Sequence, residues 1–453
     1  MTQPREAQSN GVAHTHLPRG VVFVVAVTAV VMSLPGQTAG ISAFTDFLIE
    51  ALEITRAQLS IAYLVGTIAS AFVLTPAGRA YDKLGSRVTG TVASAALGLS
   101  LVALTVAPRI VDGAVSVGIS RTAAALTTIS IGFFLVRFFG QGMMQLVGRT
   151  MVMKWFDDKR GLANAVLSSV MPLAFGAAPT MLNLLIAAHG WQGAWLILAI
   201  VLLPGFSVVA ALTFADPPPD YHRDPRGPAS RTRPPRYLRA MAGTARRFGL
   251  RRTSEPMRPE EDTTLEQARR TLAFWIFIAV TTMSSGILTG FTFHVVAILG
   301  ETGVGREAAL GILFPTAVVS VLITPIASVI SDYARLKYFA VLHGISLGLV
   351  LLSLPLLQYS SLAYLGIVVF KGLATAMFGI NQAVVWPRFF GLTYLGTITG
   401  FSTAWLVGGS AIGPYLYSLS FELTGSFLPV SYLFGPLCIL VGLLGFRADN
   451  PNR

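Results

Sequence analysis

The chain has 453 residues, of which 53% are hydrophobic and only 12% are Asp, Glu, Lys or Arg. Soluble domains carry about 25% charged residues, so this composition excludes an ordinary soluble protein. The formal net charge of +12 would suit a nucleic-acid-binding protein, but the basic residues gather between long apolar runs, where they indicate membrane topology. The single cysteine, Cys438, excludes an intrachain disulfide.

Twelve mostly apolar runs are each long enough to cross a hydrocarbon core of about 30 Å as a helix. They cover approximately residues 20–46, 57–79, 86–107, 123–153, 160–188, 191–213, 271–300, 307–330, 338–357, 361–386, 395–418 and 427–446. The first run is not followed by a cleavage site and a polar mature domain, so we expect a retained helix and not a signal peptide. The predicted fold is an all-α integral membrane protein with twelve transmembrane helices.

The positions of the basic residues predict which side of the membrane each loop faces. Most of the 33 Lys and Arg residues lie at the termini and in the even-numbered loops, so both termini are predicted to be cytoplasmic in a multi-pass protein of the plasma (inner) membrane. The predicted organisation is a cytoplasmic tail (1–19), a six-helix bundle (20–213), a basic cytoplasmic linker (214–270), a second six-helix bundle (271–446) and a short cytoplasmic tail (447–453).

An internal repeat relates the two predicted bundles. Residues of the first half recur in the second at two constant spacings: Gly36, Gly40 and Arg56 match Gly286, Gly290 and Arg306 at one spacing, and Gly161, Pro179 and Gly190 match Gly396, Pro414 and Gly425 at the other. We interpret these matches as a duplicated six-helix unit, which makes the bundles pseudo-symmetric. Chance is the alternative, because glycine accounts for 44 of the residues.

The loop after the second span reads Gly78-Arg-Ala-Tyr-Asp82-Lys83-Leu-Gly85-Ser-Arg87. At every fixed position it resembles the G-x-x-x-D-[RK]-x-G-x-[RK] signature of the major facilitator superfamily. The resemblance implies two parallel six-helix halves that move around a site at the membrane midplane, with this loop in a gating role. Asp82 is then expected to pair with Arg87 or to cap a neighbouring helix N-terminus. Membrane topology alone would explain the bases, but not the acid between them.

A second copy of this loop surrounds Asp332, which we also assign to gating, although Ser328 and Arg335 replace the two glycines. The segment Trp155-Phe-Asp-Asp-Lys-Arg-Gly-Leu-Ala163 resembles the W-F-x-x-x-R-G-x-A stretch of the monocarboxylate and oxalate/formate branch of the superfamily. The first span departs from the animal monocarboxylate carriers, since it lacks their acidic and glycine lead-in.

Three cations lie inside the predicted spans, at Arg137, Arg149 and Lys371. A cation near the bilayer centre costs about 2.5 to 3.5 kcal/mol on insertion scales, so each needs a physical reason. Arg137 and Lys371 are repeat partners within one residue, and the resemblance implies that their helices line a central cavity in which both bind substrate. For Arg137, bracing of helix packing is the alternative. Arg149 is close enough to the membrane edge to snorkel.

Helical spacing continues each cation into a stripe of polar, small or aromatic residues. Gln141, Gln145 and Gly148 share a face with Arg137, and Thr375, Phe378 and Gln382 share a face with Lys371. We therefore assign Gln141 and Gln382 to substrate binding.

Three further binding candidates follow from position alone. Gln37 follows a Pro-Gly pair in the first span, where an interrupted helix exposes backbone groups to a ligand. Tyr63 in the second span and Trp405 in the eleventh are also candidates, with a packing role as the alternative for both.

The middle of every predicted span lacks Asp and Glu. A cationic substrate would find no counter-charge there, so we expect an anion. Proton coupling then has two candidates in the protein, His294 near the outer end of the seventh span and Asp46 at the corresponding depth of the first. We expect these two residues to pair, and the substrate carboxylate is an alternative proton carrier.

The predicted function is a secondary active transporter that moves a small organic anion, a mono- or dicarboxylate, by proton symport or anion exchange. An exporter of amphipathic drugs is the alternative. The motifs of hydrolases, zinc proteases and ATPases are not found in the sequence, so we predict that the chain is not an enzyme. We also expect no cofactor, no metal and no nucleic-acid partner. The predicted partners are the anionic substrate and the lipid bilayer, and we expect a monomer.

Overall fold

A computed structural model describes residues 18–156, 160–217, 263–391 and 394–451. We call the part up to residue 217 the first half and the part from residue 263 the second half. Within these ranges the chain forms helices joined by short loops and contains no β-strand. The predicted linker lies largely outside the described residues, but its two ends do not.

The helices of the first half follow one another closely along the chain. In order they are α1 (Arg19–Met32), α2 (Thr38–Ser42), α3 (Thr45–Leu52), α4 (Arg56–Thr105), α5 (Ala107–Ser116), α6 (Arg121–Val136), α7 (Gln145–Trp155), α8 (Arg160–Ile200) and α9 (Ser207–Thr213). A π-helical segment, Arg137–Met144, joins α6 to α7, and another, Val201–Phe206, joins α8 to α9. The short 3-10 helix Leu34–Gly36 lies between α1 and α2.

The second half has a corresponding order of helices. They are α11 (Leu265–Arg269), α12 (Leu272–Phe293), α13 (Val295–Glu301), α14 (Arg306–Gly311), α15 (Leu313–Ser331), α16 (Lys337–Leu356), α17 (Leu362–Ile380), α18 (Trp386–Phe390), α19 (Leu395–Thr424) and α20 (Leu428–Leu444). A π-helical segment, Asn381–Val385, joins α17 to α18. It lies further along its helix than Arg137–Met144 does in the first half, since Lys371, the repeat partner of Arg137, is inside α17.

Ten helical segments among the described residues are long and apolar enough to cross a membrane. One of them, Val166–Thr213, has 48 residues and contains Gly190, where φ is 69° and the backbone leaves the helical conformation. A helix of about 20 residues already spans the hydrocarbon core. Helix α19, with 30 residues, is not among the ten. The all-α membrane fold is therefore confirmed, and the count of twelve crossings remains a prediction.

Glycines with positive φ lie at equivalent turns of the two halves. Gly190 has a φ of 69° and its predicted repeat partner Gly425 a φ of 72°. Such values favour glycine, which has no Cβ to clash with the backbone. Their ψ values differ, at 168° and 9°, so the two turns are not identical and the duplication inferred from the sequence stays a prediction.

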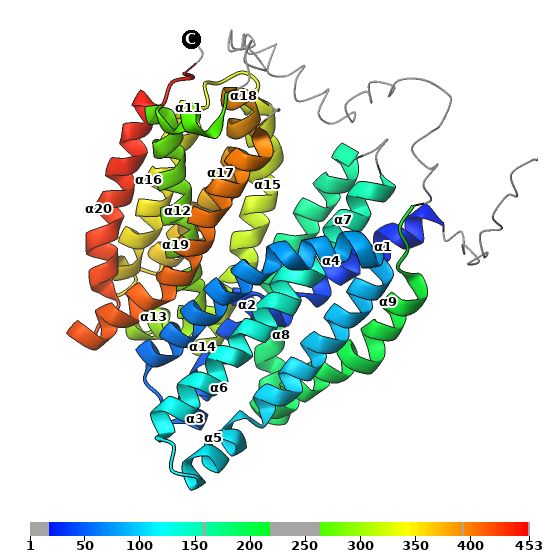
Figure 1. The fold of residues 1–453 in the computed structure, drawn as a ribbon. Helices are drawn as coiled ribbons and strands as arrows, with labels where there is room; N and C mark the ends of the chain where they lie inside the picture. Colours follow the sequence, from blue (N-terminus) through cyan, green and yellow to red (C-terminus); the bar gives the residue numbers. More distant parts are fainter. Residues whose placement is uncertain (1–17, 157–159, 218–262, 392–393, 452–453) are drawn as a thin grey trace, which may run out of the picture.

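Buried apolar side chains form separate cores in the two halves. The largest core consists of first-half residues together with Phe293, and two further cores consist of second-half residues alone. Phe293 packs against Tyr63 and Phe133 with ring centroids 4.6 and 6.5 Å apart. Figure 1 shows the halves meeting near α2, α13 and α14 and diverging towards α7 and α15. We call the divergent end the linker side, because α11 lies there, and the other end the opposite side.

Candidate functional site

A polar cavity lies between the two halves, in two connected parts. One part, of about 380 Å³, is lined by Arg137, and the other, of about 320 Å³, is lined by Lys371. Both parts share the same four wall residues, Gln37, Thr38, Ser285 and Thr289. The structure therefore places Arg137 and Lys371 in adjoining parts of one space between the halves, and their role in substrate binding stays a prediction.

Arg137 begins the π-helical segment that interrupts the fourth span. Its side chain is 4% exposed, and its Nη1 donates to the Gly36 carbonyl at 3.3 Å and to Thr38 Oγ1 at 3.4 Å. Its buried Nε atom has no hydrogen-bond partner among the described residues. Both contacts are long for a guanidinium group. These contacts give Arg137 the packing role that the sequence left open, but their length leaves its charge without a strong partner among the described residues.

The break in the first span brings its backbone against the fourth. Gln37 adopts an extended conformation after Leu34–Gly36, as expected from the Pro-Gly pair. A Cβ on Gly36 would lie 2.7 Å from the Cα of Gly140, so glycine is required at this crossing. Close approach of these backbones places the Gly36 carbonyl within reach of Arg137.

Tyr63 supports Arg137 from below the cavity surface. Its side chain is fully buried, its ring centroid lies 5.1 Å from the Arg137 guanidinium carbon, and its hydroxyl bonds to Thr38 Oγ1 at 2.8 Å. Tyr63 thus holds Arg137 and Thr38 in position. It does not line the cavity, which corrects its assignment as a binding residue.

Lys371 lines the second part of the cavity. It is 9% exposed, and its Nζ lies 5.8 Å from the Phe291 ring centroid. Within the described ranges its ammonium group has no hydrogen-bond or ion-pair partner. Thr375 and Phe378, one and two turns further along α17, line the same part, as their spacing predicts. A buried ammonium without a carboxylate is unfavourable unless an anion is supplied from outside the chain.

Of the other predicted binding residues, Gln37 and Gln141 line the cavity. Gln382 does not line the cavity. It lies in the π-helical segment Asn381–Val385, which changes the phase of the predicted stripe, and its side-chain oxygen accepts a hydrogen bond from Trp386 at 2.8 Å. Trp405 lines a different, apolar pocket on the other face of α19. Arg149 donates to Met171 Sδ at 3.4 Å, and does not line either part of the cavity.

An ion-pair network joins the halves on the opposite side. Asp46 pairs with Arg56 at 2.9 Å and with Arg306 at 3.1 Å. Arg306, from the second half, also donates to Asn183 at 2.8 Å and to the Ala43 carbonyl at 2.7 Å. Asp46 is therefore a contact between halves, in the arrangement that the structure describes.

His294 lies in the same interface but is not paired with Asp46, so the predicted pair is wrong. Its Nε2 atom lies 3.1 Å from Ser60 Oγ, 2.9 Å from Ser418 Oγ and 3.0 Å from the Pro414 carbonyl. The sequence did not predict the rotation of His294 at the C-terminal end of α12, which directs its ring towards Ser60 of α4 and Ser418 of α19.

The signature loop of the first half is organised around an acid that the sequence analysis missed. Asp216 accepts from the Ser86 backbone at 2.7 Å, from the Ser86 hydroxyl at 2.8 Å and from Lys154 at 3.0 Å. Gly85, with a φ of 75°, makes the turn that starts the next helix. A Cβ there would lie 2.7 Å from Asp216 Oδ2. The glycine of the signature is therefore needed for this contact.

The other signature residues have separate surroundings. Arg87 donates to the Phe214 carbonyl at 3.0 Å, Lys83 is exposed, and Gly78 has open space beside its Cα. The side chain of Asp82 lies outside what the structure describes, so its predicted pairing with Arg87 stays a prediction.

The second half has a similar acid at its end. Asp449 accepts from Lys337 at 2.9 Å, as Asp216 accepts from the loop of the first half. Asp332 pairs with Arg388 at 3.1 Å, inside the same half. Its gating role remains a prediction.

The contacts of Asp216 predict a pH-dependent stability. Burial raises the pKa of Asp216, but hydrogen bonds from Ser86 and from Lys154 outweigh burial and hold the pKa below its ordinary value. A carboxyl group of this kind stabilises the folded state above its ordinary pKa, and the stabilisation is lost as pH falls through the lowered pKa. We expect Asp216→Asn to lower the melting temperature by a few degrees at pH 7, and the difference from wild type to narrow towards pH 3.

Thermal unfolding of both purified proteins across this pH range checks the expectation. Asp112→Asn is the matched control, because Asp112 makes an exposed ion pair with Arg121, and such pairs contribute little. A constant difference between Asp216→Asn and wild type at every pH would contradict the assignment.

The sequence also matches a known protein family. The family model of the Major Facilitator Superfamily matches residues 23–414, a range that includes both parts of the cavity and the signature loop. A comparison with curated proteins found no match. The model covers most of the chain, and members of the family are membrane transporters. The chain therefore belongs to the major facilitator superfamily.

Proposed function

We propose that the chain transports an organic anion, a mono- or dicarboxylate, whose acidic group binds between Arg137 and Lys371. The observation that carries this proposal is the presence of two buried cations in one cavity without a lining carboxylate among the described residues. Charge-assisted hydrogen bonds to a carboxylate would use the donors that the protein leaves unsatisfied. The resemblance of Trp155–Ala163 to the monocarboxylate and oxalate/formate branch supports the same substrate class.

Alternating access requires that the two halves close the cavity on one side at a time. The network of Asp46 and Arg306 and the contacts of His294 hold the halves together on the opposite side. The described hydrogen bonds between halves lie on that side, which fits a state that opens towards the linker side. We propose that the linker side is the cytoplasmic side.

The side chains around the cavity limit which groups could couple transport to proton movement. Acids are absent from the described cavity wall, so a proton would travel on the substrate carboxylate, or the transporter would exchange anions. His294 is the remaining protein candidate, enclosed by hydroxyl groups and a carbonyl. Comparison of the pH dependence of uptake by wild type and His294→Gln in liposomes distinguishes these routes, since identical profiles would exclude His294.

Ligand-dependent stabilisation tests the substrate class. A ligand that binds the native state at 100 times its Kd raises the free energy of unfolding by about 2.7 kcal/mol. We expect carboxylates to raise the melting temperature of the purified protein by a few degrees, whereas tetraphenylphosphonium and neutral sugars leave it unchanged. Stabilisation by the cation and not by any carboxylate would refute the proposal and favour export of cationic drugs.

A further inference from the structure

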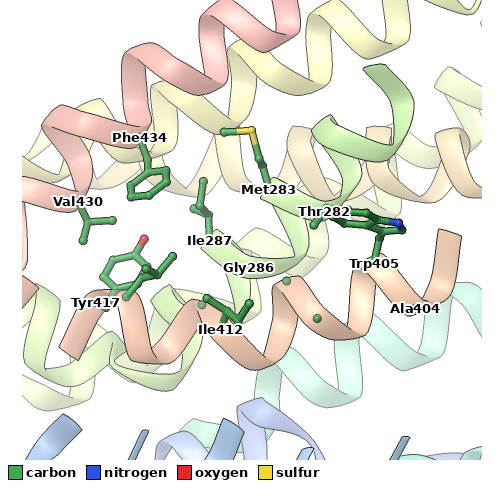
Figure 2. A pocket seen from close by; sticks show the side chains of 14 residues that line it. Thr282, Met283, Gly286, Ile287, Ala404, Trp405, Ile412, Tyr417, Val430 and Phe434 are labelled. Carbon is green, nitrogen blue, oxygen red and sulfur yellow. The ribbon is translucent and has the colours of Figure 1, made fainter. Parts of the chain in front are cut away.

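An apolar pocket of about 450 Å³ lies on the second half, away from the cation cavity. Figure 2 shows Met283 and Ile287 of α12, Trp405 and Ile412 of α19, and Phe434 of α20 around it. Trp405 and Ile412 are each 45% exposed, although their helix is embedded in an apolar bundle. In a membrane transporter such exposed side chains face lipid, so the pocket opens to the bilayer.

A third pocket, of about 690 Å³, lies between α4 and α19 and joins the other two. It shares Ala404 and Gly408 with the apolar pocket. It shares Ala71 and Val407, among others, with the cavity part that holds Arg137. The three pockets therefore adjoin one another along α19, from the Arg137 end of the cavity to the apolar pocket of Figure 2.

The chemistry of the walls changes along this space. The Arg137 end has amide and hydroxyl groups from Gln37, Gln141 and Ser410. The middle is lined by Phe72, which is 79% exposed, with Thr403 as one of few polar groups. The far end is almost entirely aliphatic and aromatic. A molecule that matches all three parts has an anionic head and an apolar tail.

We propose that the transported anion is amphipathic, a carboxylate with a long alkyl tail that enters from the bilayer between α4 and α19. The head binds Arg137, and the tail lies in the middle and apolar pockets. This inference rests on the proposed function, because it uses the same head-group site. A small carboxylate would fit within the cation cavity alone and would leave the middle and apolar pockets unfilled. A long alkyl tail would fill both of them.

A chain-length series tests the tail. We expect acetate, butanoate, octanoate and dodecanoate to bind wild-type protein in nanodiscs with affinity that rises by up to about fourfold per methylene group, the fold-change for burial of that group. Dodecanol, which has the tail without the charge, is expected to bind weakly. Binding is measured as ligand-dependent thermal stabilisation.

Gly408 offers a variant that fills the passage. A Cβ there meets nothing within 4 Å, so the side chain of Gly408→Leu starts in open space and extends into the passage. We expect this variant to lose at least about tenfold in dodecanoate affinity, the equivalent of two or more methylene groups, with acetate affinity unchanged. Gly400→Leu, in the middle pocket and equally unobstructed, is a second variant with the same expectation. Gly379→Leu, also unobstructed but outside the three pockets, is the matched control.

The outcomes separate this inference from the proposed function. Equal affinity for acetate and dodecanoate, or the same chain-length series in wild type and Gly408→Leu, would overturn the tail site while carboxylate transport stands. Bilayer lipid that permanently occupied the middle and apolar pockets would give the same result, an affinity that does not depend on chain length. Failure of every carboxylate to bind wild type would overturn the proposed function itself. Nonspecific partitioning into lipid affects all variants alike, so the comparison with Gly379→Leu removes it.

Discussion

Arg137→Gln and Lys371→Gln are each expected to reduce carboxylate binding by at least about a hundredfold, with normal expression and folding. Removal of one partner from a buried ion pair costs about 3 to 5 kcal/mol, and 1.4 kcal/mol corresponds to a factor of ten in affinity. The bound anion would be the partner of both cations. The unliganded protein should tolerate the changes well, because each removes a buried charge without a carboxylate partner in the described structure.

Equilibrium binding of a carboxylate to the purified variants, with uptake into liposomes in parallel, measures the effect. Arg137→Lys is the informative control for charge against geometry, since lysine keeps the charge but not the planar set of donors. Gln382→Leu is the matched control in the π-helical segment that follows α17, because Gln382 bonds to Trp386 and does not line the cavity. Wild-type affinity in both Arg137→Gln and Lys371→Gln would refute the two-cation site.

The cations and the helix interruption were predictable from the sequence because each carries a large local cost. A charge within an apolar run needs a counter-charge or water, and a Pro-Gly pair interrupts a helix. These costs identified Arg137, Lys371 and Gln37, which all line one cavity in the structure. The repeat added the expectation that the two cations lie at similar depth.

Features that depend on rotation about a helix were less predictable. The stripe through Lys371 holds for Thr375 and Phe378 and then fails at Gln382, where the helix becomes π-helical. A regular 3.6-residue period does not anticipate that change. Trp405 was likewise assigned to the wrong face of α19, since it lines the apolar pocket and not the cavity. An apolar helix carries little sequence signal for which of its faces meets lipid.

Contacts between distant segments were the hardest to predict. Asp216 falls at the start of a region whose composition indicated a basic cytoplasmic linker, yet it bonds to Ser86 and Lys154. Asp46 and His294 were expected to pair because of their similar depth. Asp46 instead pairs with Arg56 and Arg306, which the sequence placed in loops and which begin α4 and α14 in the structure. Loop charges were counted for topology and not considered as partners.

The second large effect is expected at this network on the opposite side. Asp46→Asn and Arg306→Gln should each shift the protein away from the state that is closed there, because Arg306 connects the second half to Asp46, Asn183 and Ala43 of the first. The side chains of Asp46 and Arg306 are 33% and 28% exposed, so the pair is partly screened. A contribution of about 1 kcal/mol would change the population ratio by roughly fivefold.

Labelling of a cysteine at Thr292, which lines the cavity, measures this shift. In a Cys438→Ser, Thr292→Cys background, a membrane-impermeant maleimide is added from the side that bears Asp46. We expect Arg306→Gln to raise the labelling rate several-fold and Arg56→Gln to raise it less, because Arg56 pairs with Asp46 inside the first half. Asp112→Asn breaks an ion pair on the same side within the first half, so its labelling should match the background. Equal rates in all four proteins would mean that the Asp46 network does not hold the halves closed, and closure would then depend on the His294 contacts and on the apolar contacts around Phe293.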